Sequence, residues 1–267
     1  MFKEKLLLGQ YYPADSPVHS LNGRAKIIAA FSYMISLFIV DNWLGWGIMT
    51  AMAMLFVIAS RLPFSAIIRG LKIIFVFCAF TLLMNVFFYP GDVVFSWGFI
   101  SISKEGVLYG FAMSLRLLLL VLAGSLLTLT TKPLVLTDAA ESLLKPLRLL
   151  RVPTHEIAMM MGIALRFIPT IMEEFQRIAL AQKARGASVS QGGIVRRLKA
   201  FIPMLIPLFV SAFRRAEDLA VAMEAKCYRG GAGRTKWKIC PWRTGDTILV
   251  IFACALFAGA IVYRNLG

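Results

Sequence analysis

Four long apolar runs fill the first half of this chain, and a fifth lies close to its end. They cover residues 25–40, 43–60, 71–89, 106–130 and 246–263. A helix needs about 20 apolar residues to cross the hydrocarbon core of a bilayer. Hydrophobic residues make up 59% of the chain and the mean hydropathy is +0.75, whereas soluble domains are roughly 45–50% apolar. The sequence therefore predicts an all-α membrane protein with about five transmembrane helices.

The first two runs, 25–40 and 43–60, are a little short for a membrane span. Flanking Arg and Lys side chains and the interfacial Trp43 and Trp46 can make up the difference. A re-entrant pair is the alternative. Two full spans are favoured because the two flanks of each run differ in charge, as the positive-inside rule requires.

Positive charge is concentrated in three stretches, 1–26, 61–72 and 132–243, within a chain of net charge +15. The last stretch contains 19 Lys/Arg and 8 Asp/Glu. A basic chain can bind nucleic acid, but here the charges lie between apolar spans, which is the pattern of loops retained in the cytoplasm. We therefore expect a multi-pass protein embedded in the lipid bilayer, with a cytoplasmic N-terminus, an external C-terminus and no nucleic-acid partner.

These patterns divide the chain into four segments. We expect a cytoplasmic lead-in at 1–25, transmembrane helices 1 to 4 at 26–131, a cytoplasmic helical domain at 132–243, and transmembrane helix 5 at 244–267. Asn22 is a plausible N-cap of the first transmembrane helix. The segment 94–103 is expected to be an external loop with a short extended piece.

The cytoplasmic domain is expected to contain two or three amphipathic helices. Thr137-Asp138-x-x-Glu141 has capping-box spacing and predicts a helix that runs to residue 150. The segment 154–183 carries apolar residues at spacings of three and four from Ile157 to Ile178, which gives one continuous stripe. A further helix is predicted from 194 to 225, and we expect these two long helices to cross at or under the membrane surface.

Both long helices end in a similar short motif. The first reads Ala181-Gln182-Lys183-Ala184-Arg185-Gly186-Ala187 and the second reads Ala222-Met223-Glu224-Ala225-Lys226-Cys227-Tyr228. Aligned, they give Ala-x-x-Ala-basic-small twice, with Arg185 matching Lys226. One interpretation is a stabilising cationic cap at a helix end. The other is a cation placed to reach an acidic groove on another protein, and the repetition favours it because a cap does not need the surrounding alanines.

Catalytic signals are sparse. The chain has two histidines, His19 and His155, without a His-Glu-x-x-His pattern, and it has no phosphate-binding Gly-x-x-x-x-Gly-Lys-Ser/Thr loop. Its four cysteines form no C-x-x-C pair and indicate neither a disulfide framework nor a metal site. We therefore expect a chain that is not an enzyme, has no catalytic residues, and binds no metal or cofactor itself.

Arg116 lies inside the otherwise apolar run 106–130. A charged side chain within a membrane span is a functional candidate by default. The alternative is that Arg116 lies near the outer end of a tilted helix and extends to the interface. If Arg116 is functional, the chain could be a self-contained secondary transporter or channel, which is the main alternative function.

Several motifs together resemble one family. They are Ser16-x-x-His19-x-Leu21-Asn22-x-Arg24-x-Lys26, Lys145-Pro146-x5-Val152-Pro153, Ala164-Leu165-Arg166-Phe167-Ile168-Pro169 and Ala184-Arg185-Gly186. The chain is similar to the transmembrane coupling (T) component of energy-coupling-factor transporters, a bacterial branch of the ATP-binding-cassette importers. The second motif departs from the family's Ala-Arg-Gly, because Lys226-Cys227 replaces Arg-Gly and Arg229 follows. Either Lys226 or Arg229 could make the second contact.

The resemblance implies a scaffold subunit in the bacterial cell membrane that joins two cytoplasmic ATPases, as a homodimer or a heterodimer, to one substrate-capture membrane protein. That capture protein could be exchangeable. ATP and Mg would bind to the partner ATPases, and vitamins or transition-metal ions are the usual cargo. The ATPase-docking residues implied are Ala184, Arg185, Gly186, Ala225, Lys226, Cys227 and Arg229.

The resemblance also implies that the apolar stripes of the two long helices hold the capture protein. The residues expected at that interface are Ile157, Met160, Met161, Ala164, Ile168, Ile171, Phe175, Ile178, Leu205 and Phe209. Methionines such as Met160 and Met161 are more often ordinary core filler. On an exposed helix face, their flexible side chains would suit several different partners.

Overall fold

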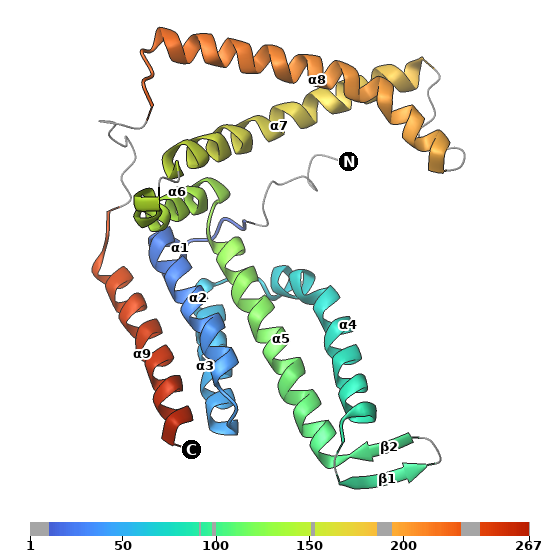
Figure 1. Ribbon diagram of the computed structural model, residues 1–267, viewed down its shortest axis with the longest axis vertical. Coiled ribbons are helices and arrows are strands. Elements are labelled where there is room, and N and C mark those ends of the chain that lie inside the picture. Colours follow the sequence, from blue (N-terminus) through green and yellow to red (C-terminus); the bar gives the residue numbers. More distant parts are fainter. Residues whose placement is uncertain are drawn as a thin grey trace. The chain divides into compact units, whose positions relative to one another are not determined.

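The computed structural model describes residues 11–90, 92–97, 100–150, 153–185, 194–230 and 241–266. The chain divides into two compact units. We call Met1–Leu143 with Ile239–Gly267 the bundle unit, and Leu144–Lys238 the crossed-pair unit. In the described residues, all regular structure is helical apart from one short hairpin (Figure 1). The protein is therefore an all-α membrane protein, as the apolar runs predict.

Seven α-helices form the described part of the bundle unit. They are α1 (Pro17–Ser20), α2 (Gly23–Ile39), α3 (Trp43–Ser60), α4 (Phe64–Phe88), α5 (Lys104–Thr130), α6 (Pro133–Leu144) and α9 (Thr244–Leu266). Helix α2 packs along α9 and α5, and α5 also packs against α3 and α4. The core between these helices contains Leu37, Met49 and Leu119, each no more than 2% exposed.

Small residues allow two of these helix pairs to approach closely. Ala25 and Ala29 of α2 form a buried cluster with Ala253 of α9, and the Ser32 hydroxyl donates to the Ala253 carbonyl across 3.0 Å. Between α4 and α5, the Ser114 hydroxyl donates to the carbonyl of Cys78 at 3.0 Å. Small side chains and interhelical hydrogen bonds are the usual means by which membrane helices associate.

Local sequence signals explain most helix ends, with one error. Asn22 caps α2 as predicted, because its side chain accepts a hydrogen bond from the backbone N–H of Arg24 at 3.0 Å. The predicted helix start at Thr137 is wrong. Helix α6 begins at Pro133, since proline fits the first position of a helix, where no N–H is needed. It ends at Leu144 rather than 150, and the 3₁₀ helix η1 (Lys145–Leu150) follows.

The expected external loop contains an antiparallel hairpin of β1 (Val93–Trp97) and β2 (Ile100–Ser103). It lies at the end of the bundle unit opposite α6 (Figure 1). Ser103 then caps α5, because its hydroxyl accepts from the backbone N–H of Gly106 at 3.0 Å. The extended piece predicted here is confirmed, and it is two strands rather than one.

Five described helices are long and apolar enough to cross a membrane, namely α3, α4, α5, α9 and α7 (Thr154–Ala184). Helix α2 has 17 residues and is shorter than any of them, about 25 Å at 1.5 Å per residue. The sequence instead assigns a span to α2 and a surface position to α7. Packing of α2 along α5 and α9 supports the first assignment. The charges of Glu173, Glu174 and Arg177 within α7 support the second.

The crossed-pair unit is built on α7 and α8 (Ile194–Ala225), both close to their predicted bounds. Figure 1 shows the two long helices crossing, and they pack against each other there. Arg215 of α8 donates to the Glu174 carboxylate of α7 at 2.9 Å. The predicted crossing of two long helices is therefore confirmed.

Candidate functional site

The first candidate docking residues lie at the carboxyl end of α7. Arg185 follows the last helical residue, Ala184, and its backbone N–H donates to the carbonyls of Ala181 and Gln182 at 3.1 Å each. These bonds fix the backbone while the Arg185 side chain stays exposed. Gly186 lies outside the described residues. The structure thus places an exposed cation at a well-defined helix end, where unpaired carbonyls favour positive charge.

The second candidate lies at the carboxyl end of α8, where the backbone forms a Schellman motif. The N–H of Tyr228 donates to the carbonyl of Met223 at 3.0 Å, and the N–H of Cys227 donates to the carbonyl of Glu224 at 2.8 Å. Cys227 adopts a left-handed conformation with φ of 55°. This position normally takes glycine, because glycine has no Cβ to clash there. The left-handed backbone at this position therefore explains why a small residue follows the cation in the motif.

Both cations of the second motif are exposed. Lys226 is bonded through its backbone N–H to the carbonyls of Ala222 and Met223 at 3.2 Å each. Arg229 lies beyond the Schellman turn, and its side chain is also exposed, as are those of Ala225 and Cys227. The two interpretations of the second contact, Lys226 or Arg229, therefore both remain predictions.

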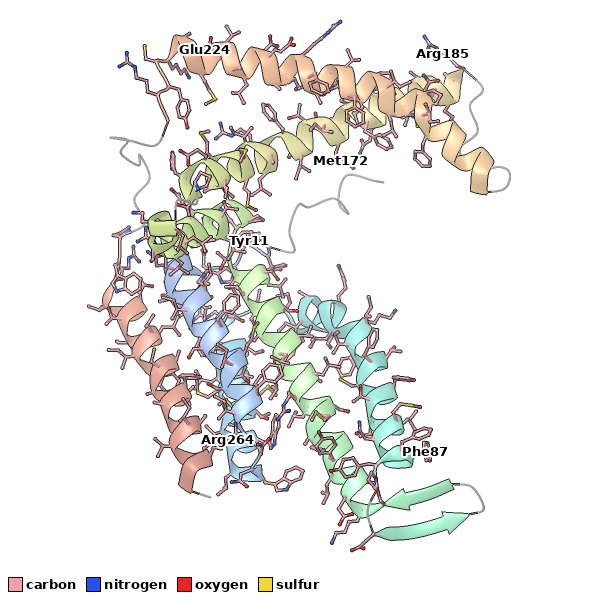
Figure 2. All side chains as sticks on the ribbon, in the orientation of Figure 1. Tyr11, Phe87, Met172, Arg185, Glu224 and Arg264 are labelled. Carbon is pink, nitrogen blue, oxygen red and sulfur yellow. The ribbon has the colours of Figure 1, made fainter. Side chains whose placement is uncertain are left out.

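The two motifs lie far apart within the crossed-pair unit. Figure 2 shows Arg185 at one end of the crossed helices and Glu224, the residue before Ala225, at the other end. A single small groove could not accept both. The arrangement suits two separate contacts, one at each end of the pair.

The predicted apolar stripe of α7 is exposed over its first half. Ile157, Met160 and Met161 are 40%, 58% and 51% exposed, and Ala164 is also exposed. The remaining stripe residues, closer to the crossing with α8, are half-buried: Ile168, Ile171, Phe175 and Ile178. A partner could therefore cover a large area on the first half of the stripe and a smaller one on the second.

Helix α8 has two different apolar faces. Met204 is 2% exposed and shares a face with Arg215, three helical turns away, which contacts α7. The predicted interface residues Leu205 and Phe209 lie outside that face and are 41% and 61% exposed. The face that packs on α7 and the face available to a partner are therefore separate.

Sequence reasoning missed three members of the exposed face of α8. Ile202, Ile206 and Phe213 are 52%, 59% and 67% exposed, and with Phe209 they recur at spacings of four, three and four. This spacing places all four on one stripe, roughly opposite Met204. The signal was present in the sequence, but the uncharged run 200–213 is apolar all round, so its periodicity does not distinguish the packed face from the exposed one.

Arg116 contacts the turn between α2 and α3. Its guanidinium donates to the carbonyl of Val40, the C-cap of α2, and pairs with Asp41, both at 3.3 Å. It also lies over the rings of Trp46 and Phe38, 5.1 and 5.8 Å from their centres. Arg116 lies midway along α5, and its contacts give it a structural role in holding the turn between α2 and α3.

The motif around Ser16 and His19 also forms local contacts. The Nε2 atom of His19 lies 3.1 Å from the carbonyl of Tyr12, which can accept but not donate. Nε2 therefore carries the proton, and Nδ1 accepts from the Ser16 hydroxyl at 2.7 Å. Burial lowers the pKa of His19 below its usual 6.5, in agreement with this neutral ring.

Metal ions in proteins are usually held by groups of His, Cys, Asp or Glu side chains. Within the described residues, no three of these side chains come together in a group that could hold a metal ion. The candidate docking features among the described residues are two cationic helix ends and two apolar stripes. Such features suit contacts with other proteins rather than chemistry.

The chain is similar to known proteins over most of its length. The family model described as cobalt transport protein (CbiQ) matches residues 14–237. The energy-coupling factor transporter transmembrane protein EcfT of Acidaminococcus fermentans is 46% identical over 94% of each chain. EcfT of Ruminiclostridium cellulolyticum is 48% identical over 87% of each chain. EcfT of Listeria innocua is 45% identical over 97% of this chain and 98% of its own.

These matches cover nearly the whole chain, including both long helices of the crossed-pair unit. The protein is a multi-pass membrane protein, and its relatives are named as transmembrane components of a transporter. The chain therefore belongs to the CbiQ family, among the transmembrane components of energy-coupling factor transporters.

Proposed function

We propose that this chain links two cytoplasmic ATPases to a membrane protein that captures the substrate, and that it transmits their ATP-driven motion for uptake of vitamins or other micronutrients. The observation that carries this proposal is the pair of cationic helix ends. Arg185 follows the last residue of α7 and Lys226 follows the last residue of α8. Figure 2 shows Arg185 and Glu224, which precedes Lys226 by two residues, at opposite ends of the crossed pair. Two helix ends with the same sequence pattern suit two similar partners.

Each helix end fits an acidic groove on an ATPase. The backbone hydrogen bonds of Arg185 and Lys226 hold the helix termini, and their exposed side chains extend the positive charge beyond them. A guanidinium can form paired hydrogen bonds with a carboxylate, which an ammonium cannot. The end with Arg185 should therefore dock more tightly, unless Arg229 supplies the guanidinium at the other end.

The substrate-capture protein would cover the two exposed apolar stripes. One is the first half of α7, from Ile157 to Ala164, and the other runs along α8 from Ile202 to Phe213. Apolar surface of this extent is normally covered by a partner or a membrane. Flexible Met160 and Met161 would let the same stripe accept different capture proteins.

In this mechanism ATP and Mg bind to the ATPases, and this chain contributes no catalytic group. Closure of the ATPases would displace both docked helix ends, and the crossed pair would move the capture protein as a rigid body. By the positive-inside rule, the basic stretches favour a cytoplasmic position for the crossed-pair unit and the N-terminus in a bacterial cell. No residue of this chain needs to touch the substrate.

Co-purification from membranes tests the ATPase contacts. We expect a tagged chain to retain two ATPases and one small hydrophobic protein, Arg185→Glu to weaken ATPase retention, and Arg185→Glu with Lys226→Glu to abolish it. Arg214→Glu is the matched control, because Arg214 is exposed on the middle of α8. ATPase retention that is unchanged in the double variant, or a chain that purifies alone, would refute the docking role and favour a self-contained carrier.

Polar substitutions test the apolar stripes. Met161→Asn and Phe209→Asn should release the capture protein while the ATPases stay bound, because the cationic ends are untouched. Leu180→Asn and Val221→Asn are matched controls, since Leu180 and Val221 are 68% and 65% exposed and lie off both stripes. Loss of both kinds of partner together would show that the assignment of faces is wrong.

A further inference from the structure

The first turn of α2, Asn22–Lys26, contacts both segments through which the chain passes between its two units. The chain leaves the bundle unit after α5 and α6, and it returns at the start of α9. We call Asn22–Lys26 the anchor turn. The anchor turn belongs to the sequence motif that runs from Ser16 to Lys26. The proposed docking to partners does not explain this motif.

Lys26 holds the outgoing segment. Its side chain is buried, with the residue 6% exposed, and its ammonium donates to the carbonyl of Thr130 at 3.0 Å and to the hydroxyl of Thr131 at 3.3 Å. Thr130 is the last residue of α5. The final carbonyls of a helix have no partner within the helix and favour a cation. Lys26 thus fixes the end of α5.

Asp246 holds the returning segment. It is 1% exposed, and its two carboxylate oxygens accept from the backbone N–H of Asn22 at 2.7 Å and from that of Arg243 at 2.8 Å. Asp246 lies in the first turn of α9, where a negative charge is stabilised by the helix dipole. One carboxylate therefore joins the start of α9 to the anchor turn.

Gly23 brings α6 against the same turn. A Cβ at Gly23 would lie 3.1 Å from the Cβ of Ala139 and 3.3 Å from the carbonyl oxygen of Val135. Both are residues of α6. Any larger side chain at Gly23 would push α6 away, so the close approach depends on glycine.

The helices are not fully packed beneath the anchor turn. A cavity of ≈ 90 Å³ lies between α2, α3, α5 and α9, and Lys26, Thr130 and Ala253 are among its lining residues. Incomplete apolar packing holds helices less rigidly than a filled core. The polar contacts of Lys26 and Asp246 therefore contribute much of what holds the helices in place at this end of the bundle.

We propose that Lys26 and Asp246 are positioning residues that fix both connections of the crossed-pair unit, so that displacement of that unit moves α5 and α9 instead of being absorbed at their ends. The proposal rests on the proposed function, in which the ATPases displace the crossed helices. Removal of either charged group leaves the backbone groups that it bonds without their partner. Transmission of motion should therefore be sensitive to either residue.

The test measures ATP-driven motion in the bundle unit of the whole complex with its ATPases. Spin labels are attached to Cys254 on α9 and to Ile58→Cys on α3, two exposed positions. Cys78 and Cys240 are replaced by Ser, and Cys227 by Gly, the residue that its left-handed backbone favours, and this reference chain is first shown to retain the same ATPases as the unmutated chain. We expect ATP to shift the distance between the labels in the reference complex. Lys26→Met and Asp246→Asn should each abolish most of that shift, while ATP hydrolysis is retained.

Two variants separate transmission from folding. Arg24→Ala, in the same turn, should keep both the shift and the hydrolysis, and Lys26→Arg should recover part of the shift. If the Lys26→Met chain does not assemble with the ATPases, the shift is measured in Gly23→Ala instead. This variant displaces α6 without removing a buried charge. An undiminished shift in the assembled variants, or no ATP-driven shift in the reference complex, overturns the proposal. Loss of the ATPases from the reference complex would instead refute the proposed function.

Discussion

Arg215 of α8 and Glu174 of α7 form a 2.9 Å ion pair where the two long helices cross. Their side chains are 37% and 26% exposed, so water screens the pair and its contribution to stability is about 1 kcal/mol or less. The pair therefore sets the position of the crossing without locking it.

We predict that Arg215→Met loosens the crossing without unfolding either helix. Amides of α7 and α8 near the pair should exchange with deuterium a few-fold faster, because about 1 kcal/mol corresponds to a factor of about five. Arg214→Met is the control, as the neighbouring exposed arginine. Equal exchange in the two variants would show that the pair does not hold the crossing.

Replacing Cys227 with glycine should stabilise the end of α8. Cys227 has φ of 55°, a conformation that costs a residue with a Cβ about 1 kcal/mol relative to glycine. Hydrogen exchange at the amide of Tyr228, which bonds to the carbonyl of Met223, should slow in Cys227→Gly. In contrast, Cys254→Gly within α9 should be destabilising by up to about 1 kcal/mol. Faster exchange at Tyr228 in Cys227→Gly would contradict the assigned backbone geometry.

The contact between α4 and α5 should depend on Gly106. A Cβ at Gly106 would lie 2.7 Å from the carbonyl oxygen of Asn85, a backbone atom that cannot move alone. Gly106→Ala should therefore lower the free energy of unfolding by about 1–3 kcal/mol, as overpacking usually does. Thermal unfolding in detergent measures this effect. Gly47→Ala is the control, since no atom lies within 4 Å of its added Cβ, and an equal loss there would refute the packing argument.

Much of the fold follows from local sequence signals. The bounds of α7 and α8 and the cap at Asn22 are predictable, because capping residues and apolar periodicity act within a few turns. The start of α6 was mispredicted because two local signals compete. Pro133 starts the helix one turn before the capping-box spacing of Thr137 and Glu141 would.

The parts of the site that sequence could not supply depend on tertiary packing. The repeat predicts both cationic ends, but the separation of Arg185 from Lys226 requires the crossing geometry. The exposed stripe of Ile202 and Phe213 is hidden in a run that is apolar on all sides. The roles of Lys26 and Asp246 join residues more than a hundred positions apart, a relation that no local pattern contains.

Arg116 gives the last prediction. Its guanidinium bonds to the Val40 carbonyl and to Asp41 at 3.3 Å, so Arg116→Met leaves the C-terminal carbonyl of α2 without its donor. We expect the free energy of unfolding to fall by about 1–3 kcal/mol, measured by thermal unfolding in detergent.

Asp41→Asn should cost less than Arg116→Met, about 1 kcal/mol or below, because the Asp41 side chain is 75% exposed. Co-purification of the ATPases with folded Arg116→Met should be unchanged, since Arg116 belongs to the bundle unit and no cationic helix end is altered. A folded Arg116→Met chain with normal stability but without transport would instead make Arg116 a functional residue within the membrane. In that outcome the ion pair with Asp41 would be incidental, and the self-contained carrier would again be the better hypothesis.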